Sequence, residues 1–98
     1  METNIKTTPE VWDYSIQKLI HKVYKTLPIY EEEGDWKKQQ EAIILDLKGF
    51  DSLFADKPNF LNAAVKVAAL SFAENHVQFR KLVFEAITEL SELRKEVQ

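Results

Sequence analysis

Apolar residues recur along this chain every three or four positions, in four segments separated by short polar stretches. In the first segment they form one stripe on a 3.6-residue period, which is typical of an amphipathic helix. The stripe consists of Trp12, Ile16, Leu19, Ile20, Val23 and Leu27. Thr8 can cap the free amides, Pro9 suits the first helical position, and Pro28 is expected to end the helix. The pattern therefore predicts a helix over residues 9–27.

Two further helices are expected over residues 36–54 and 58–73. Asp35 is a natural N-cap for the earlier one, and Gly49 should bend or fray its last turn because glycine costs about 1 kcal/mol relative to alanine inside a helix. Its apolar side comprises Trp36, Gln40, Ile43, Ile44, Leu47, Phe50 and Phe54. For the 58–73 helix, the expected core face is Leu61, Ala64, Val65, Ala68 and Phe72, with Phe60, Val67 and Leu70 beside it.

The stretch "ENHVQF" marks the turn into the last helix, predicted over residues 76–97. Asn75 and Gln78 have the spacing of a capping box. In that motif the Asn75 side chain accepts from the amide of Gln78, and the Gln78 side chain reaches back to the amide of Asn75. An apolar seam follows, formed by Phe79, Leu82, Val83, Ala86, Ile87, Leu90, Leu93 and Val97. His76 is therefore interpreted first as part of a helix-to-helix turn, and only secondarily as a ligand.

Four helices with short connections predict an all-α, antiparallel up-down four-helix bundle that forms a single domain over residues 1–98. Each helix has one strong apolar stripe, so its stability depends on packing against the others. The chain has 98 residues and no cysteine, which excludes disulfides and cysteine-ligated metals. The N-terminus has no apolar leader segment, so a soluble, cytoplasmic product is expected.

Charge and motifs restrict the function further. The formal net charge is −3, and residues 29–56 hold eight acidic and three basic residues, so no concentrated basic face is present for nucleic acid. No glycine-rich phosphate loop, nucleophile elbow or paired metal-binding histidines occur, since His21 and His76 lie on different predicted helices. We therefore expect no enzymatic activity, no cofactor and no metal.

The remaining candidate chemistry is a group of basic residues on the last two predicted helices. Such residues most often form a solvated charged face. The functional alternative is a docking face for an acidic protein surface or for the inner leaflet of a membrane. The group consists of Lys66, Arg80, Lys81, Arg94 and Lys95.

Four segments, in this order and spacing, resemble the immunity proteins against pediocin-like (class IIa) bacteriocins, in particular the enterocin A immunity group. They are "IHKVY", "ADKPNFL", "ENHVQF" and "AITELSEL", and the resemblance in their order and spacing covers residues 16–93. The resemblance implies a cytosolic four-helix bundle that recognises the mannose phosphotransferase permease once a bacteriocin has engaged it, and that then blocks the pore. It also implies a peripheral position at the inner membrane face.

In that group the C-terminal half is held to choose which bacteriocin is resisted, which adds His76 and Gln78 to the candidate partner-binding residues. The expected mechanism is contact between the last two helices and the bacteriocin-loaded permease. Two other classes stay open at this point. One is a small helical inhibitor or antitoxin-like module for a soluble protein, and the other is a small hydrolase or metal protein.

Overall fold

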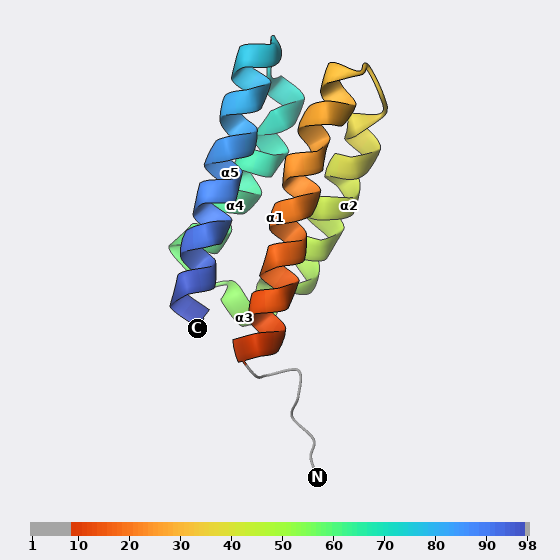
Figure 1. Cartoon of the computed structure of the whole chain (residues 1–98). Helices are drawn as coiled ribbons and strands as arrows, with labels where there is room; N and C mark the ends of the chain where they lie inside the picture. Colours follow the sequence, from red (N-terminus) through yellow and green to blue (C-terminus); the bar gives the residue numbers. More distant parts are fainter. Residues whose placement is uncertain (1–8, 98) are drawn as a thin grey trace.

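The computed structural model describes residues 9–97, and the side chains of residues 12–96. Its main helices are α1 (Pro9–Glu31), α2 (Trp36–Gly49), α4 (Pro58–Ala69) and α5 (His76–Val97), with the short helix α3 (Asp51–Phe54) and the 3-10 turn η2 (Leu70–Phe72) between them. Consecutive main helices run in opposite directions (Figure 1). In the described part of the chain, the predicted all-α antiparallel four-helix bundle is confirmed.

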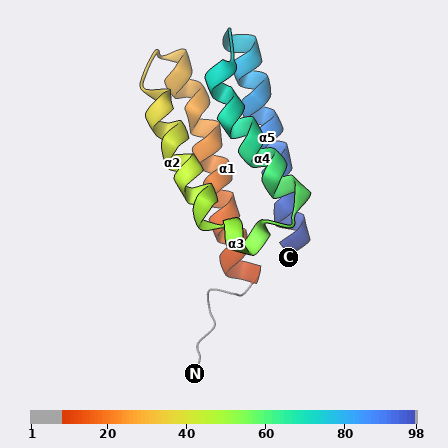
Figure 2. The same cartoon turned by 180° about the vertical axis from the view of Figure 1, so that it is seen from behind.

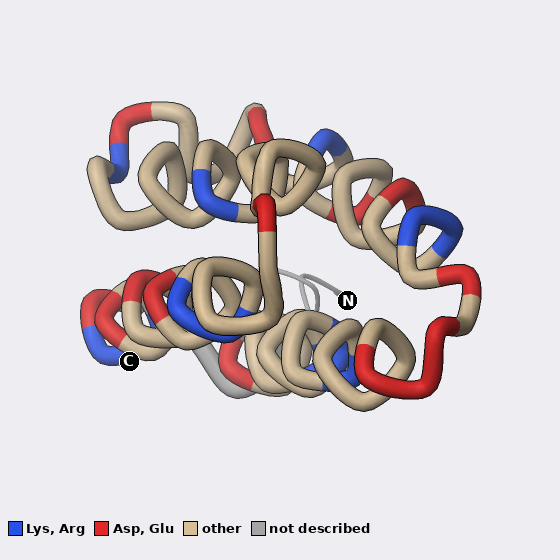
Figure 3. The backbone as a smooth tube through the Cα atoms, turned by 90° about the horizontal axis from the view of Figure 1, so that it is seen from above, with Lys and Arg blue, Asp and Glu red and all other residues tan. Residues whose placement is uncertain are grey.

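The bundle has two layers. Figure 1 shows α1 and α5 side by side in front, and Figure 2, seen from the opposite side, shows α2 and α4 in front. Viewed down the helices, the four coils enclose a common centre (Figure 3). The apolar side of each helix meets there, and α5 packs along both α1 and α4. Of the four main helices, α5 makes the most extensive contacts with its neighbours.

Aromatic side chains fill the two ends of the core. At the end near α3, the buried Phe54 ring lies 5.8 Å from the ring centroids of Trp12, Phe50 and Phe60. At the other end, Phe79 is fully buried, with its centroid 4.0 Å from Tyr30 and 4.9 Å from Trp36. The latter cluster joins α1, α2 and α5, so it fixes the three helices to one another at that end.

The prediction that Pro28 ends the first helix is wrong. Pro28 lies inside α1, which continues to Glu31. Proline has a helix-compatible φ and removes a single hydrogen bond, and the extra turn allows Tyr30 to stack on Phe79. The helix start at Pro9 is as predicted, whereas the predicted cap, Thr8, lies outside the described residues.

The predicted helix over residues 36–54 is divided in two. Asp35 caps α2 as expected, with Oδ1 accepting from the Lys38 amide at 3.2 Å. The helix ends at Gly49, and α3 begins after Phe50. The bend expected at Gly49 therefore becomes a real break, which lets Phe50 and Phe54 both turn toward the core.

The core face predicted for the third helix is also wrong. Phe60, Ala63, Val67 and Leu70 are buried, whereas Leu61, Val65, Ala68 and Phe72 are exposed. Apolar residues surround most of this helix, so periodicity alone could not select the buried side. In the observed orientation, the buried amide of Gln40 of α2 also donates to the Val67 carbonyl at 2.9 Å. The α-helix ends at Ala69 rather than at residue 73, and η2 continues to Phe72.

The turn into α5 forms half of the predicted capping box. Asn75 Oδ1 accepts from the amide of Gln78 at 2.9 Å, as expected. The return bond differs, because Gln78 Oε1 accepts from the amide of Glu74 at 2.8 Å rather than from that of Asn75. The predicted extent of α5, residues 76–97, is confirmed.

Candidate contact surface

Phe84 of α5 stands at the surface between two shallow hollows. Its side chain is 38% exposed although most aromatic rings of the bundle face the core. On the α4 side it borders a hollow of about 410 Å³, together with Lys66 and Lys81. On the α1 side it borders a hollow of about 450 Å³, together with Tyr24. Phe84 is thus a partly exposed apolar side chain with a hollow on each side.

Polar and aromatic groups surround this ring. The Arg80 guanidinium lies 5.2 Å from the centroid of Phe84, one helical turn away, and the Tyr24 ring meets Phe84 edge-on at 6.3 Å. A cation–π contact at an exposed site contributes about 0.5–1 kcal/mol, so it holds the Arg80 side chain over the ring. Arginine and aromatic residues are enriched among the residues that dominate protein interfaces. We call Tyr24, Arg80, Lys81 and Phe84 the α5 contact surface.

Charge on the α4 side of this surface is partly neutralised. Lys66 Nζ lies 2.9 Å from Glu85 Oε1, which joins α4 to α5. This hydrogen-bonded ammonium lowers the pKa of the Glu85 carboxyl, and the nearby Lys81 charge adds to the effect. Lys81 itself forms no ion pair with another described residue. The cations available to a partner are therefore Arg80 and Lys81 rather than Lys66.

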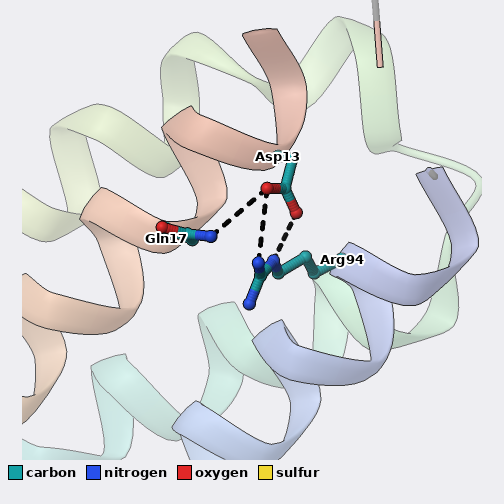
Figure 4. A network of polar contacts seen from close by, with 3 residues as sticks. All are labelled: Asp13, Gln17 and Arg94. Atoms are coloured by element: carbon teal, nitrogen blue, oxygen red, sulfur yellow. Dashed lines mark hydrogen bonds and ion pairs between the residues drawn. The ribbon is translucent and has the colours of Figure 1, made fainter. Parts of the chain in front are cut away.

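Arg94 and Lys95, predicted to belong to the same face as Arg80, lie further along α5, and Arg94 borders the same α1-side hollow as Phe84. Arg94 pairs with Asp13 of α1, with Nη2 3.3 Å from Oδ2, and Gln17 donates to the same carboxylate (Figure 4). Fourteen residues separate Arg80 from Arg94, which is about 21 Å along a helix. Lys95 is 73% exposed and lies 3.3 Å from Glu92 on its own helix. Arg94 thus ties α5 to α1, and its charge is engaged by Asp13 rather than available to a partner.

His76 and Gln78 lie at the turn between η2 and α5. His76 Nε2 is 2.6 Å from Glu31 Oε2, and its ring stacks over Tyr30 at 6.3 Å. His76 and Tyr30 border a hollow of about 550 Å³ at this end of the bundle, whereas Gln78 does not line it. Gln78 Oε1 accepts a hydrogen bond from the Glu74 amide and so helps to cap α5. His76 and Gln78, both predicted contact residues, therefore have local structural roles at the end of the bundle that holds the loop between α1 and α2.

Two kinds of site are not found among residues the structure describes. No three His, Cys, Asp or Glu side chains come together in a group that could hold a metal ion. No described helix is long and apolar enough to cross a membrane.

The sequence reasoning missed Phe84 and Tyr24. A signal was present, because Phe84 falls outside the apolar seam of its helix, four residues after Arg80, where a charged residue would be usual. Comparison with known proteins adds no further information: no family model, curated protein or solved structure matches this chain.

Proposed function

We propose that this chain protects a bacterial cell from a pediocin-like bacteriocin. In this proposal it acts by contact in the cytoplasm, at the inner membrane face, on the mannose phosphotransferase permease engaged by the bacteriocin. The resemblance of the four sequence segments supports this class, and the antiparallel four-helix bundle is the fold that the resemblance implies. No chemical step is required of the protein.

The main observation in favour of the α5 contact surface as the binding site is the exposed Arg80–Phe84 pair. It lies in the C-terminal half, which the resemblance associates with the choice of bacteriocin. A rigid helix presents both side chains, so little conformational freedom is lost on binding. Covering the exposed part of Phe84 contributes about 1 kcal/mol, and Arg80 and Lys81 supply charge for carboxylates around the pocket that receives the ring.

The test is a bacteriocin challenge of a sensitive lactic acid bacterium that expresses the chain from an inducible promoter. We expect the inhibitory concentration of one or a few pediocin-like bacteriocins to rise about tenfold or more, which corresponds to about 1.4 kcal/mol in the controlling equilibrium. Co-purification should recover the permease only after bacteriocin treatment. An unchanged inhibitory concentration across the panel, with folded protein present in the cells, would contradict the proposal.

The same surface also suits a second candidate, a helical inhibitor of a soluble protein. An arginine held over a phenylalanine is a general protein-binding feature and does not specify a membrane partner. This candidate predicts that affinity purification enriches one soluble protein, without the permease, and that Phe84→Ala removes that protein from the purified fraction.

A further inference from the structure

The solvent side of α4 carries no charged residue. Within Pro58–Ala69 the single charged side chain is Lys66, and it faces α5 through its ion pair with Glu85. The opposite side is apolar and continues onto η2. It consists of Leu61, Val65, Ala68 and Phe72, of which the three larger residues are 48%, 63% and 81% exposed. We call these four residues the α4 stripe.

The spacing of the α4 stripe is that of a helix-pairing seam. Its residues follow one another by four, three and four positions, as do the a and d positions of a heptad. A helix that lies on lipid instead shows a wide apolar arc bordered by lysine and arginine. Beside this stripe lie the uncharged Asn62 and Ala69. We propose that the α4 stripe pairs two copies of this chain, with α4 of one copy antiparallel to α4 of the other.

The stripe is symmetric about a point midway between Lys66 and Val67. Leu61 and Phe72 lie equally far from that point, and so do Val65 and Ala68. An antiparallel two-fold arrangement therefore sets Leu61 against Phe72 of the second copy at each end of the seam, and Val65 against Ala68 at its centre. A two-fold interface requires such self-complementarity. Figure 2 shows no described element in front of α4 when the bundle is viewed from the α2–α4 layer.

Charges at the two ends of the stripe favour the same arrangement. Lys57, whose Nζ lies 3.9 Å from Glu96 Oε1 of its own chain, precedes α4, and Glu74 follows η2. Antiparallel pairing brings Lys57 of one copy toward the turn that holds Glu74 of the other, which is attractive at both ends. Parallel pairing would instead bring like charges together, at a cost in free energy.

The expected association is weak. The stripe offers three large side chains, which is well below the roughly 800 Å² per partner of a standard stable interface. We therefore expect a dissociation constant on the order of 100 μM, so that dimers form only at high local concentration. Because the α4 stripe and the α5 contact surface share no residue, the pairing of two copies can be tested independently of the proposed function.

Sedimentation equilibrium of the full chain from about 10 μM to 1 mM tests the pairing at the concentrations it requires. Wild type should change from monomer to dimer over this range. Val65→Glu places a charge beside the symmetry point, and because Val65 is 63% exposed the variant should keep its far-UV circular dichroism while the association weakens at least about tenfold. The matched control is Leu45→Glu on α2, at a site 66% exposed and outside the stripe, which should associate like wild type.

Cysteine cross-linking tests the orientation, since the natural chain contains no cysteine. A mixture of Val65→Cys and Ala68→Cys chains should form the mixed disulfide faster than either variant forms its own. Wild type that stays monomeric at the highest concentration would overturn the proposal, as would a Val65→Glu chain that dimerises normally. Preferred Val65→Cys homodimers would overturn the antiparallel arrangement. Binding to phosphatidylglycerol vesicles that Val65→Glu abolishes, without any dimer, would instead identify lipid as the occupant and contradict pairing.

Discussion

Glu33, in the turn between α1 and α2, has a backbone conformation that its side chain disfavours. Its φ is +60°, the one positive value among non-glycine residues of the described chain. The turn closes α1 with two bonds, from the Glu33 amide to the Tyr30 carbonyl at 3.0 Å and from the Gly34 amide to the Ile29 carbonyl at 2.8 Å. This is the Schellman arrangement, in which glycine normally takes the left-handed position. Here glutamate takes it, and glycine comes one residue later.

Glu33→Gly should therefore stabilise the protein. A left-handed conformation costs a residue with a β-carbon about 1–2 kcal/mol, and the greater freedom of glycine in the unfolded chain offsets about 0.5–1 kcal/mol of the relief. The net gain is about 0.5–1 kcal/mol. At Glu32, whose φ is not positive, the same substitution keeps only the entropic cost, and we expect a loss of about 0.5–1 kcal/mol. Both variants remove one carboxylate, so charge does not distinguish them.

Urea unfolding followed by far-UV circular dichroism measures the difference, with equal m-values required for the comparison. The two glycine variants should shift the midpoint in opposite directions. Gly34→Ala, like Glu32→Gly, should lower the stability of the protein, because a β-carbon at residue 34 would lie 3.0 Å from Ile29 Cγ2. If Glu33→Gly proved as destabilising as Glu32→Gly, the strain assigned to this turn would be refuted.

Three further predictions concern the core and the ion pairs. Phe79→Ala should cost about 3–5 kcal/mol in thermal or urea unfolding, since Phe79 is fully buried among aromatic rings; a loss below about 1 kcal/mol would contradict its assigned role. Arg94→Met should cost about 1 kcal/mol, and a double-mutant cycle with Asp13→Asn should show coupling, whereas additive losses would argue against the pair. Lys66→Met should raise the pKa of Glu85 toward its ordinary 4.5 in a carboxyl NMR titration. Because that pKa is lowered in the fold, the Lys66–Glu85 pair stabilises the protein above pH 4.5, and its contribution is lost as the pH falls through the lowered value. The free energy of unfolding of this variant should therefore fall less steeply at acid pH than that of wild type. An unchanged Glu85 titration would contradict the assignment.

The fold was largely predictable from sequence because three helices carry a single apolar stripe each. Their buried residues, such as Ile16 on α1 and Leu90 on α5, fall on the predicted seams. The local stop signals were less reliable. Pro28 lies within a helix because tertiary packing of the following turn outweighs one lost hydrogen bond.

The surface was less predictable, for two physical reasons. Around α4, apolar residues occupy both the core side and the solvent side, so the buried side follows from packing and contacts with other helices, such as the Gln40 amide on the Val67 carbonyl, which periodicity does not reveal. On α5, sequence reasoning grouped cations by proximity along the chain. Pairing between helices then distinguishes them, since Arg94 meets a carboxylate of α1 that no local pattern reveals.

The measurement that tests the central claim most directly compares three chains in one sensitive strain, with inhibitory concentration of the cognate bacteriocin as the readout. The chains are wild type, Phe84→Ala, and Tyr14→Ala, the last a control at an aromatic site 62% exposed on α1 and outside the α5 contact surface. Immunoblots and circular dichroism establish equal expression and folding. We predict that Tyr14→Ala protects like wild type while Phe84→Ala loses about tenfold or more of the protection. Full protection by Phe84→Ala would contradict the assignment of immunity to the α5 contact surface.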